Sequence, residues 1–367
     1  MRFSPILSGY IGRQFAAAFA TVLSVIVGLI LLFDLIELLR RAAGREGVSF
    51  TVVLGMALLK LPQMVHVILP FAVMIGAMVA LWRLTRSAEL VVARAAGVSV
   101  WQLLTPVLSL VFIVGVLEVT AFNPFASALY ARYERLQDSL LLRQSNPLAF
   151  SQGGLWLREQ TENRQSVVYA GLVRQEGFVL KLRDVTILHL DGADHFVDRV
   201  DAGGGTLADG FFHLQDVWLM KPGRHSEHLD EISIKTSLTL SKIQDNFASP
   251  EAISFWELPG FIDFFESAGF SAHRQKLYWH SLMASPLLLC GMALVAAMVS
   301  IKPNMRSGGL MFRIAFGVTA GFLFYFFSKV VYALGLSMTL PLSLAAWSPP
   351  AVVSLVGLAS LFHQEDG

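Results

Sequence analysis

The chain has 367 residues, of which 54% are hydrophobic and 15% are charged, and its mean hydropathy is +0.59. This composition excludes an ordinary soluble globular protein and predicts several membrane-spanning helices. The formal net charge of +1 gives no electrostatic basis for nucleic-acid binding. The single cysteine, Cys290, excludes an internal disulfide.

The N-terminal region predicts a first membrane span that stays in the protein. Arg2 and Arg13 are followed by a long apolar run. This run is longer than the core of a signal peptide, and no small-x-small cleavage pattern closes it cleanly. We therefore expect a span over about residues 15–39, with Asp34 and Glu37 near its far end.

Five more apolar runs reach the length of about 20 residues that a helix needs to cross a bilayer. The second run contains Pro62 and Pro70, but it is long enough to cross even with a kink there. The third run is expected to end at Asn123 and Pro124. The expected spans after the first are 52–82, 101–122, 277–300, 310–331 and 340–362.

The stretch 83–99, between the second and third spans, is too charged for hydrocarbon. Its charged side chains are Arg83, Arg86, Glu89 and Arg94. Its apolar residues nevertheless recur every three or four positions, which predicts a short helix that begins after Ser87 and stops at Gly97. Two interpretations remain open: an amphipathic helix at the membrane surface that offers one face to a partner, and an ordinary solvated loop helix.

The polar insert between the third and fourth spans, residues 123–271, has the pattern of an all-β domain. Short runs rich in Val, Ile, Phe, Thr and Leu alternate with polar residues, and glycines supply turns between them. Strands without intervening helices favour a sandwich, a jelly roll or an open barrel. We expect helices at 126–143 and 255–268, and strands at 166–173, 178–190, 195–201, 211–220 and 231–240.

Basic residues predict the orientation in the membrane. One side carries Arg2, Arg13, Arg83, Arg86, Arg94, Lys302 and Arg306, and the positive-inside tendency makes that side cytoplasmic. The insert and the loop at 40–49 then lie on the opposite side. That loop breaks the tendency, because it contains Arg40, Arg41 and Arg45.

The usual motifs for soluble catalysis are missing from the sequence. It contains no phosphate-binding loop, no H-E-x-x-H and no G-x-S-x-G. His225, Glu227 and His228 form the closest metal-like cluster, but their turn favours a solvated loop. We expect no catalytic residue, metal or cofactor. Charges within or near the spans are functional candidates, and for Glu118 we expect solvation at the membrane interface.

Three short motifs resemble one family. The first is SAELVV at 87–92 with AGVS at 96–99, the second is GLW at 154–156, and the third is GVTAGFLFY at 317–325 with Pro341 after it. Together with the order of three spans, β insert and three spans, they resemble the lipopolysaccharide export permeases LptF and LptG, most closely the LptG branch. The resemblance covers the whole chain.

The resemblance implies an α-helical membrane protein of six spans with an inserted, jelly-roll-like periplasmic β domain. Its expected parts are 1–122 with a cytoplasmic coupling helix at 84–97, 123–271, and 272–367. It would be the permease subunit of an ABC transporter in a Gram-negative inner membrane. Its expected partners are the sister permease LptF, a dimer of the ATPase LptB, LptC and the LptA bridge, with lipopolysaccharide as substrate. The LptF paralogue is the alternative identity.

The same resemblance assigns residue roles. ATPase coupling would involve Arg86, Ser87, Glu89, Leu90, Val91, Val92 and Gly97, with Glu89 meeting a basic residue. Lipid A phosphates would meet Arg40, Arg41 and Arg45, although a plain head-group anchor is the alternative. The family can carry a lysine where this chain has Asp34. Acyl chains would meet Leu29, Leu32, Phe33, Ile36, Phe316, Phe324 and Phe327 of the first and fifth spans.

Two rival functions follow from the residues themselves. A membrane-bound enzyme acting on lipid precursors would use the carboxylates Asp34 and Glu37, and the purified chain alone would then turn over substrate. A scaffold that passes a signal without moving any substrate would tolerate Arg40→Glu together with Arg41→Glu.

Overall fold

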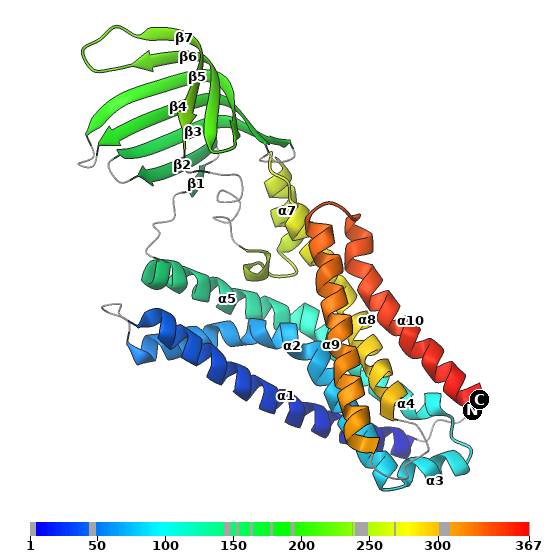
Figure 1. Cartoon of the computed structure of the whole chain (residues 1–367). Coiled ribbons are helices and arrows are strands. Elements are labelled where there is room, and N and C mark those ends of the chain that lie inside the picture. Colours follow the sequence, from blue (N-terminus) through cyan, green and yellow to red (C-terminus); the bar gives the residue numbers. More distant parts are fainter. Residues whose placement is uncertain are drawn as a thin grey trace. The chain divides into compact units, whose positions relative to one another are not determined.

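The computed structural model describes most of the chain (Figure 1). The described residues are 5–43, 49–142, 148–151, 154–161, 164–176, 179–191, 195–236, 238, 249–267, 269–300 and 309–366. They form two compact units. One comprises Met1–Glu134, Pro250–Leu258 and His273–Gly367, and the other comprises Arg135–Ser249 and Pro259–Ala272.

The first unit is a helical bundle. Six of its described helices are long and apolar enough to cross a membrane, which confirms the predicted number of spans. The bundle contains α1 (Pro5–Ala42), α2 (Phe50–Arg86), α3 (Glu89–Ala95), α4 (Val100–Leu117), α8 (His273–Ser300), α9 (Gly309–Leu336) and α10 (Leu342–Asp366). Pro62 and Pro70 lie inside α2, which remains one helix.

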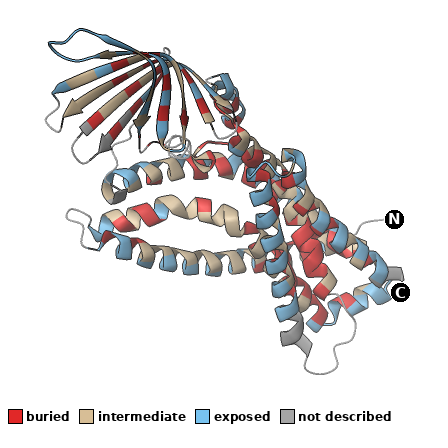
Figure 2. Ribbon diagram, turned by 45° about the horizontal axis from the view of Figure 1, so that its top comes forward, coloured by how far each residue is buried: buried red, intermediate tan, exposed pale blue. Residues whose placement is uncertain are grey.

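The core of the bundle lies between α2, α4, α8 and α10, and its fully buried members include Met74, Leu104 and Leu289 (Figure 2). Small residues let α8 and α10 approach closely. A Cβ added at Gly291 would lie 2.1 Å from Val353 Cγ1, and one at Gly357 would lie 2.6 Å from Leu294 Cβ. Each helix therefore places a side chain directly against a glycine of the other.

The third span does not end at Asn123 and Pro124 as the sequence suggested. The π-helical turn η1 (Glu118–Phe122) leads directly into α5 (Asn123–Gln137) and the second such turn η2 (Asp138–Leu142). Pro124 has no N–H to donate to the carbonyl of Thr120. The indole Nε1 of Trp256 donates to that carbonyl instead, at 3.0 Å. An outside donor thus replaces the missing helical bond.

The second unit holds one antiparallel sheet, and its presence between the third and fourth spans confirms the predicted β insert. Its seven described strands pair in sequence order. They are β1 (Leu148–Ser151), β2 (Gly154–Thr161), β3 (Arg164–Glu176), β4 (Val179–Asp191), β5 (Phe196–Ala208), β6 (Phe211–Met220) and β7 (Glu227–Lys235). The strand pattern of the sequence missed β1 and β2. The helix expected at 255–268 is present as α7 (Leu258–Ser267).

The alternation of buried and exposed residues changes phase in the middle of the sheet. In β4, Leu180 and Leu182 are buried, and the next buried residues are Val185 and Ile187. Between them Asp184 has a φ of 52°, a left-handed conformation that shifts the following side chains to the other face. β6 does the same at Asp216, with a φ of 55°. In β4 and β6 the face that a residue occupies therefore depends on whether it precedes or follows this aspartate.

Candidate functional site

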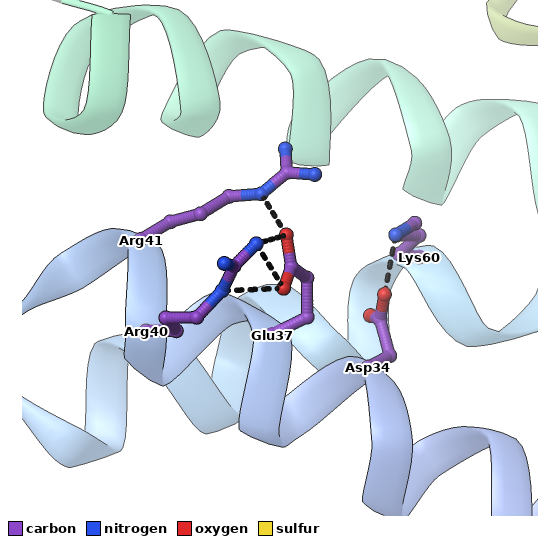
Figure 3. A network of polar contacts seen from close by, with 5 residues as sticks. All are labelled: Asp34, Glu37, Arg40, Arg41 and Lys60. Atoms are coloured by element: carbon purple, nitrogen blue, oxygen red, sulfur yellow. Dashed lines mark hydrogen bonds and ion pairs between the residues drawn. The ribbon is translucent and has the colours of Figure 1, made fainter.

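Five charged side chains gather where α1 approaches its C-terminal end (Figure 3). Asp34, Glu37, Arg40 and Arg41 lie three or four residues apart on α1, a spacing that places them along one side of a helix. Lys60 comes from the neighbouring helix α2. We call these five residues the charged cluster. It contains three cations and two carboxylates, which leaves one net positive charge.

Glu37 bridges both arginines. Arg40 donates from Nε to Glu37 Oε2 at 2.9 Å and from Nη2 to Glu37 Oε1 at 3.0 Å, a two-pronged contact that suits a guanidinium. Arg41 donates from Nε to Glu37 Oε1 at 2.8 Å. The side chains are 76% exposed for Arg40, 55% for Arg41 and 35% for Glu37. This part of the cluster is open to an incoming group.

Asp34 forms an ion pair with Lys60, which ties α1 to α2. Both side chains are more buried than the arginines, at 13% exposed for Asp34 and 20% for Lys60. The ammonium of Lys60 also lies 5.6 Å from the ring centroid of Tyr133. The sequence placed Asp34 near the end of the first span but did not predict its partner. Neither carboxylate of the proposed enzyme pair is free, since Asp34 and Glu37 each hold a cation.

The structure brings Arg40 and Arg41 together and leaves the third predicted phosphate ligand untested. Arg45 lies outside the described residues. Lys60 is the cation that the sequence did not place in this region. Its position near the end of α1 offsets the negative charge that Asp34 introduces there.

The first and fifth spans, α1 and α9, are the least buried of the six described spans. Only 11% and 17% of their most apolar segments are buried, against 61% for α8. Both pack on α2: Phe19 of α1 lies against Gly76, and Tyr325 of α9 packs on Phe71 with ring centroids 5.0 Å apart. They therefore flank α2 and leave most of their own apolar surface uncovered.

Six of the seven residues predicted to meet acyl chains are exposed, and they are Leu29, Leu32, Phe33, Ile36, Phe316 and Phe327. The four on α1 follow helical spacing and share one face. Phe324 differs, because it is partly buried against the core of the bundle. Phe322 and Phe326, on either side of it in the sequence, are exposed instead.

The stretch between α2 and α4 contains a helix that is shorter than predicted. α2 continues through Arg86 and ends at Ser87, because the next residue, Ala88, has a left-handed φ of 61°. The next helix begins two residues after Ser87, close to the predicted position, but Ser87 caps the end of α2 and not the start of α3. α3 begins after Ala88, which has a φ of 61° and makes no side-chain cap.

The end of α3 follows the prediction. Gly97 has a φ of 87°, its N–H donates to the carbonyl of Arg94 at 2.9 Å, and Val98 N–H donates to Ala93 at 3.1 Å. This pair of bonds is the Schellman arrangement that favours glycine. Leu90 is buried and anchors α3 to the bundle.

Two valines of α3 are not covered by the described part of the chain. Val91 is 57% exposed and Val92 is 67% exposed, and the charged residues Glu89 and Arg94 are exposed beside them. Two adjacent apolar side chains on a seven-residue helix, framed by charges of both signs, are typical of a surface that a partner covers.

A second polar cluster lies deep in the bundle. Glu118 is 4% exposed, so the expected solvation at the interface is wrong. Its carboxylate pairs with His66 of α2 and accepts a hydrogen bond from Ser285 Oγ of α8 at 2.9 Å. Burial of a carboxylate costs free energy unless partners hydrogen-bond it, and two helices supply these partners. Within the described residues, no group of three or more His, Cys, Asp or Glu side chains is placed to hold a metal ion.

Comparison with known proteins decides the family. The sequence profile described as Lipopolysaccharide export system permease LptF/LptG matches residues 9–363. The chain belongs to the LptF/LptG family.

The family relationship confirms the resemblance drawn from the three motifs. The chain is 26% identical to the Lipopolysaccharide export system permease protein LptG of two Escherichia coli strains, over 97% of this chain and 96% of theirs. It is 23% identical to the protein of that name from Haemophilus influenzae, over 89% of each chain. The relatives carry the LptG name, as the motifs predicted. Membership of a permease family indicates a transport subunit rather than an enzyme.

Proposed function

We propose that the chain is the permease subunit that takes lipopolysaccharide laterally from the outer leaflet of the inner membrane and passes it toward a periplasmic bridge. It would work with a sister permease of the LptF type and a dimer of a separate ATPase of the LptB type. LptC and the LptA bridge would receive the lipid. The β unit would lie in the periplasm, in a part spanning residues 123–271 between the helical parts 1–122 and 272–367.

The observation that carries the proposal is the pairing of an uncovered apolar surface with a charged cluster on α1. α1 and α9 present exposed leucine, isoleucine and phenylalanine side chains, and the exposed guanidiniums of Arg40 and Arg41 follow at the end of α1. Lipopolysaccharide has the same layout, with acyl chains that end at a phosphorylated head group. Apolar contacts would hold the chains and the arginines would hold the phosphates.

The exposed face of α3 supports the ATPase partner. α3 lies between two spans, and Val91 and Val92 form an apolar patch next to Glu89. A groove of the ATPase that covers these valines and presents a basic residue to Glu89 would transmit the movement of the ATPase to α2 and α4. A helix at 89–95 is sufficient for this role, although the sequence suggested 84–97.

The first experiment is co-purification. The chain is expressed at its native level and solubilised gently, and the proteins that accompany it are identified by mass spectrometry. A sister six-span protein and an ATPase are the expected companions. Recovery of the chain alone from several mild detergents, with turnover of a lipid precursor, would favour the enzyme instead.

The second experiment tests the phosphate contact. Arg40→Glu with Arg41→Glu is expected to reduce lipopolysaccharide delivery to the outer membrane. Lys221→Glu with Arg224→Glu makes the same change of charge in an exposed turn of the β unit and serves as the control. Equal delivery by both double variants would remove the lipid A assignment.

A further inference from the structure

We infer that Glu37 is an internal substitute for a lipid phosphate, which holds Arg40 and Arg41 in the empty site and is displaced when a phosphate-bearing lipid arrives. The inference rests on the proposed function, because it assumes that these two arginines meet the substrate. It adds a competing group that belongs to the chain itself.

The contacts of the Glu37 carboxylate resemble those that a phosphate would make with the same arginines. Both oxygens of the Glu37 carboxylate are engaged, by three N–H groups from two guanidiniums, at 2.8 to 3.0 Å. A phosphate monoester is tetrahedral, but it also presents pairs of acceptor oxygens to a guanidinium, with more oxygens and more negative charge than a carboxylate, so it can take over these contacts. The resting carboxylate also keeps the guanidiniums oriented, which reduces the ordering that binding would otherwise require.

Exposure makes the exchange feasible. Contacts between exposed ions are weak, and each changes an equilibrium constant by no more than about fivefold. The Glu37 contacts belong to this class, since Arg40 and Arg41 are both more than half exposed. The neighbouring pair of Asp34 and Lys60 is not an exposed contact of this kind, because its side chains are only 13% and 20% exposed. The two pairs made by Glu37 can open at little cost, and the pair of Asp34 and Lys60 holds α1 against α2.

A displaceable carboxylate has a functional consequence. A bare pair of arginines would hold a phosphorylated lipid tightly and release it slowly. Glu37 returns to the arginines as the phosphate leaves, so it favours release as well as opposing binding. A transport site needs both steps, because a substrate that is bound too tightly is not passed on.

The test measures binding of lipid A to the full chain, in nanodiscs together with the subunits that purify with it. Glu37→Gln removes the charge and keeps the shape, and it is expected to raise the affinity for lipid A carrying both phosphates by roughly three- to fivefold. Glu37→Ala is a second neutral variant with the same expected direction. Glu37→Asp keeps the charge and is expected to stay within about twofold of the unmodified protein.

Two further ligands show which part of the lipid the site recognises. Dephosphorylated lipid A is expected to bind equally to all Glu37 variants. Inorganic phosphate at millimolar concentration is expected not to displace lipid A, because the acyl chains supply most of the binding. Displacement by inorganic phosphate would overturn the assignment of the site to a lipid head group.

A double-mutant cycle separates the inference from the proposed function. Arg40→Gln with Arg41→Gln is expected to weaken binding of phosphorylated lipid A, and Glu37→Gln is expected to have no further effect in that background. If the arginine variant binds normally, the proposed function of the cluster fails. If the arginine variant is weak but Glu37→Gln and Glu37→Ala bind no better than the unmodified protein, only the role of Glu37 is overturned. Glu231→Gln in the β unit controls for the change in net charge.

Discussion

The ion pair between Asp34 and Lys60 provides the sharpest test of how the charged cluster is held. Lys60→Met removes the ammonium and keeps a long apolar side chain that fits a membrane helix. Asp34 then keeps a carboxylate that is 13% exposed and has lost its cation. We expect α1 to separate more easily from α2, because this pair connects the two helices near the end of α1.

Two energies bound the loss of stability expected for Lys60→Met. Two unit charges 4 Å apart attract each other by about 4 kcal/mol at an effective dielectric constant of 20. Removing one partner of a buried pair costs about 3–5 kcal/mol in soluble proteins. The partial exposure of Asp34 and Lys60 lets water relieve some of this loss. We therefore expect Lys60→Met to lower the free energy of unfolding by about 2–4 kcal/mol.

The assay is reversible unfolding of the purified chain in mixed micelles, with the denaturing detergent increased in steps. Asp34→Asn with Lys60→Met removes both charges, and we expect it to recover most of the stability lost in Lys60→Met. The coupling from the complete cycle should exceed about 1 kcal/mol. A coupling below about 0.5 kcal/mol, with Lys60→Met as stable as the unmodified chain, would refute the reasoning.

Three further changes test other parts of the structure. Glu89→Lys is expected to reduce recovery of the ATPase with the chain severalfold and to leave the melting temperature unchanged, since Glu89 is exposed; recovery at the normal level would remove its coupling role. Gly291→Val is expected to lower the free energy of unfolding by about 2–4 kcal/mol, because even a Cβ there would lie 2.1 Å from Val353. An unchanged unfolding curve would contradict the close contact of α8 and α10. Glu118→Leu removes the carboxylate that His66 and Ser285 contact. It is expected to lower the free energy of unfolding by about 1–3 kcal/mol in the same assay. A stabilised variant would show that the buried carboxylate is not needed for packing.

Several features of the fold could be predicted from the sequence because they depend on neighbouring residues. A membrane span requires about 20 apolar residues in succession, and six such runs are visible without a structure. The β insert was likewise visible from alternating runs and glycines, although short strands at its start were missed. Gly97 was correctly placed at a helix end, because a left-handed residue after a helix is favoured as glycine.

The sequence rules for helix ends failed at two positions. The sequence Asn123-Pro124 normally ends a helix, but the indole of Trp256 occupies the carbonyl that the proline leaves free, and the helix continues. Ser87 has the chemistry of a helix start, but it ends α2, because Ala88 after it has a left-handed φ of 61°. The contact of Trp256 joins residues 136 positions apart, so it does not follow from the residues next to Pro124.

The sequence by itself determined the number of spans, the β insert between them and the family, because hydropathy and short motifs are properties of adjacent residues. Only the tertiary structure decided how the intramembrane charges are partnered. Asp34 meets Lys60 across 26 positions, His66 meets Glu118 across 52, and Ser285 reaches Glu118 across 167. Charges in a membrane need partners, but the packing of the helices determines which charge meets which. The bridge from Glu37 to Arg40 and Arg41 lies within one helix, but only the structure shows how exposed each of its side chains is.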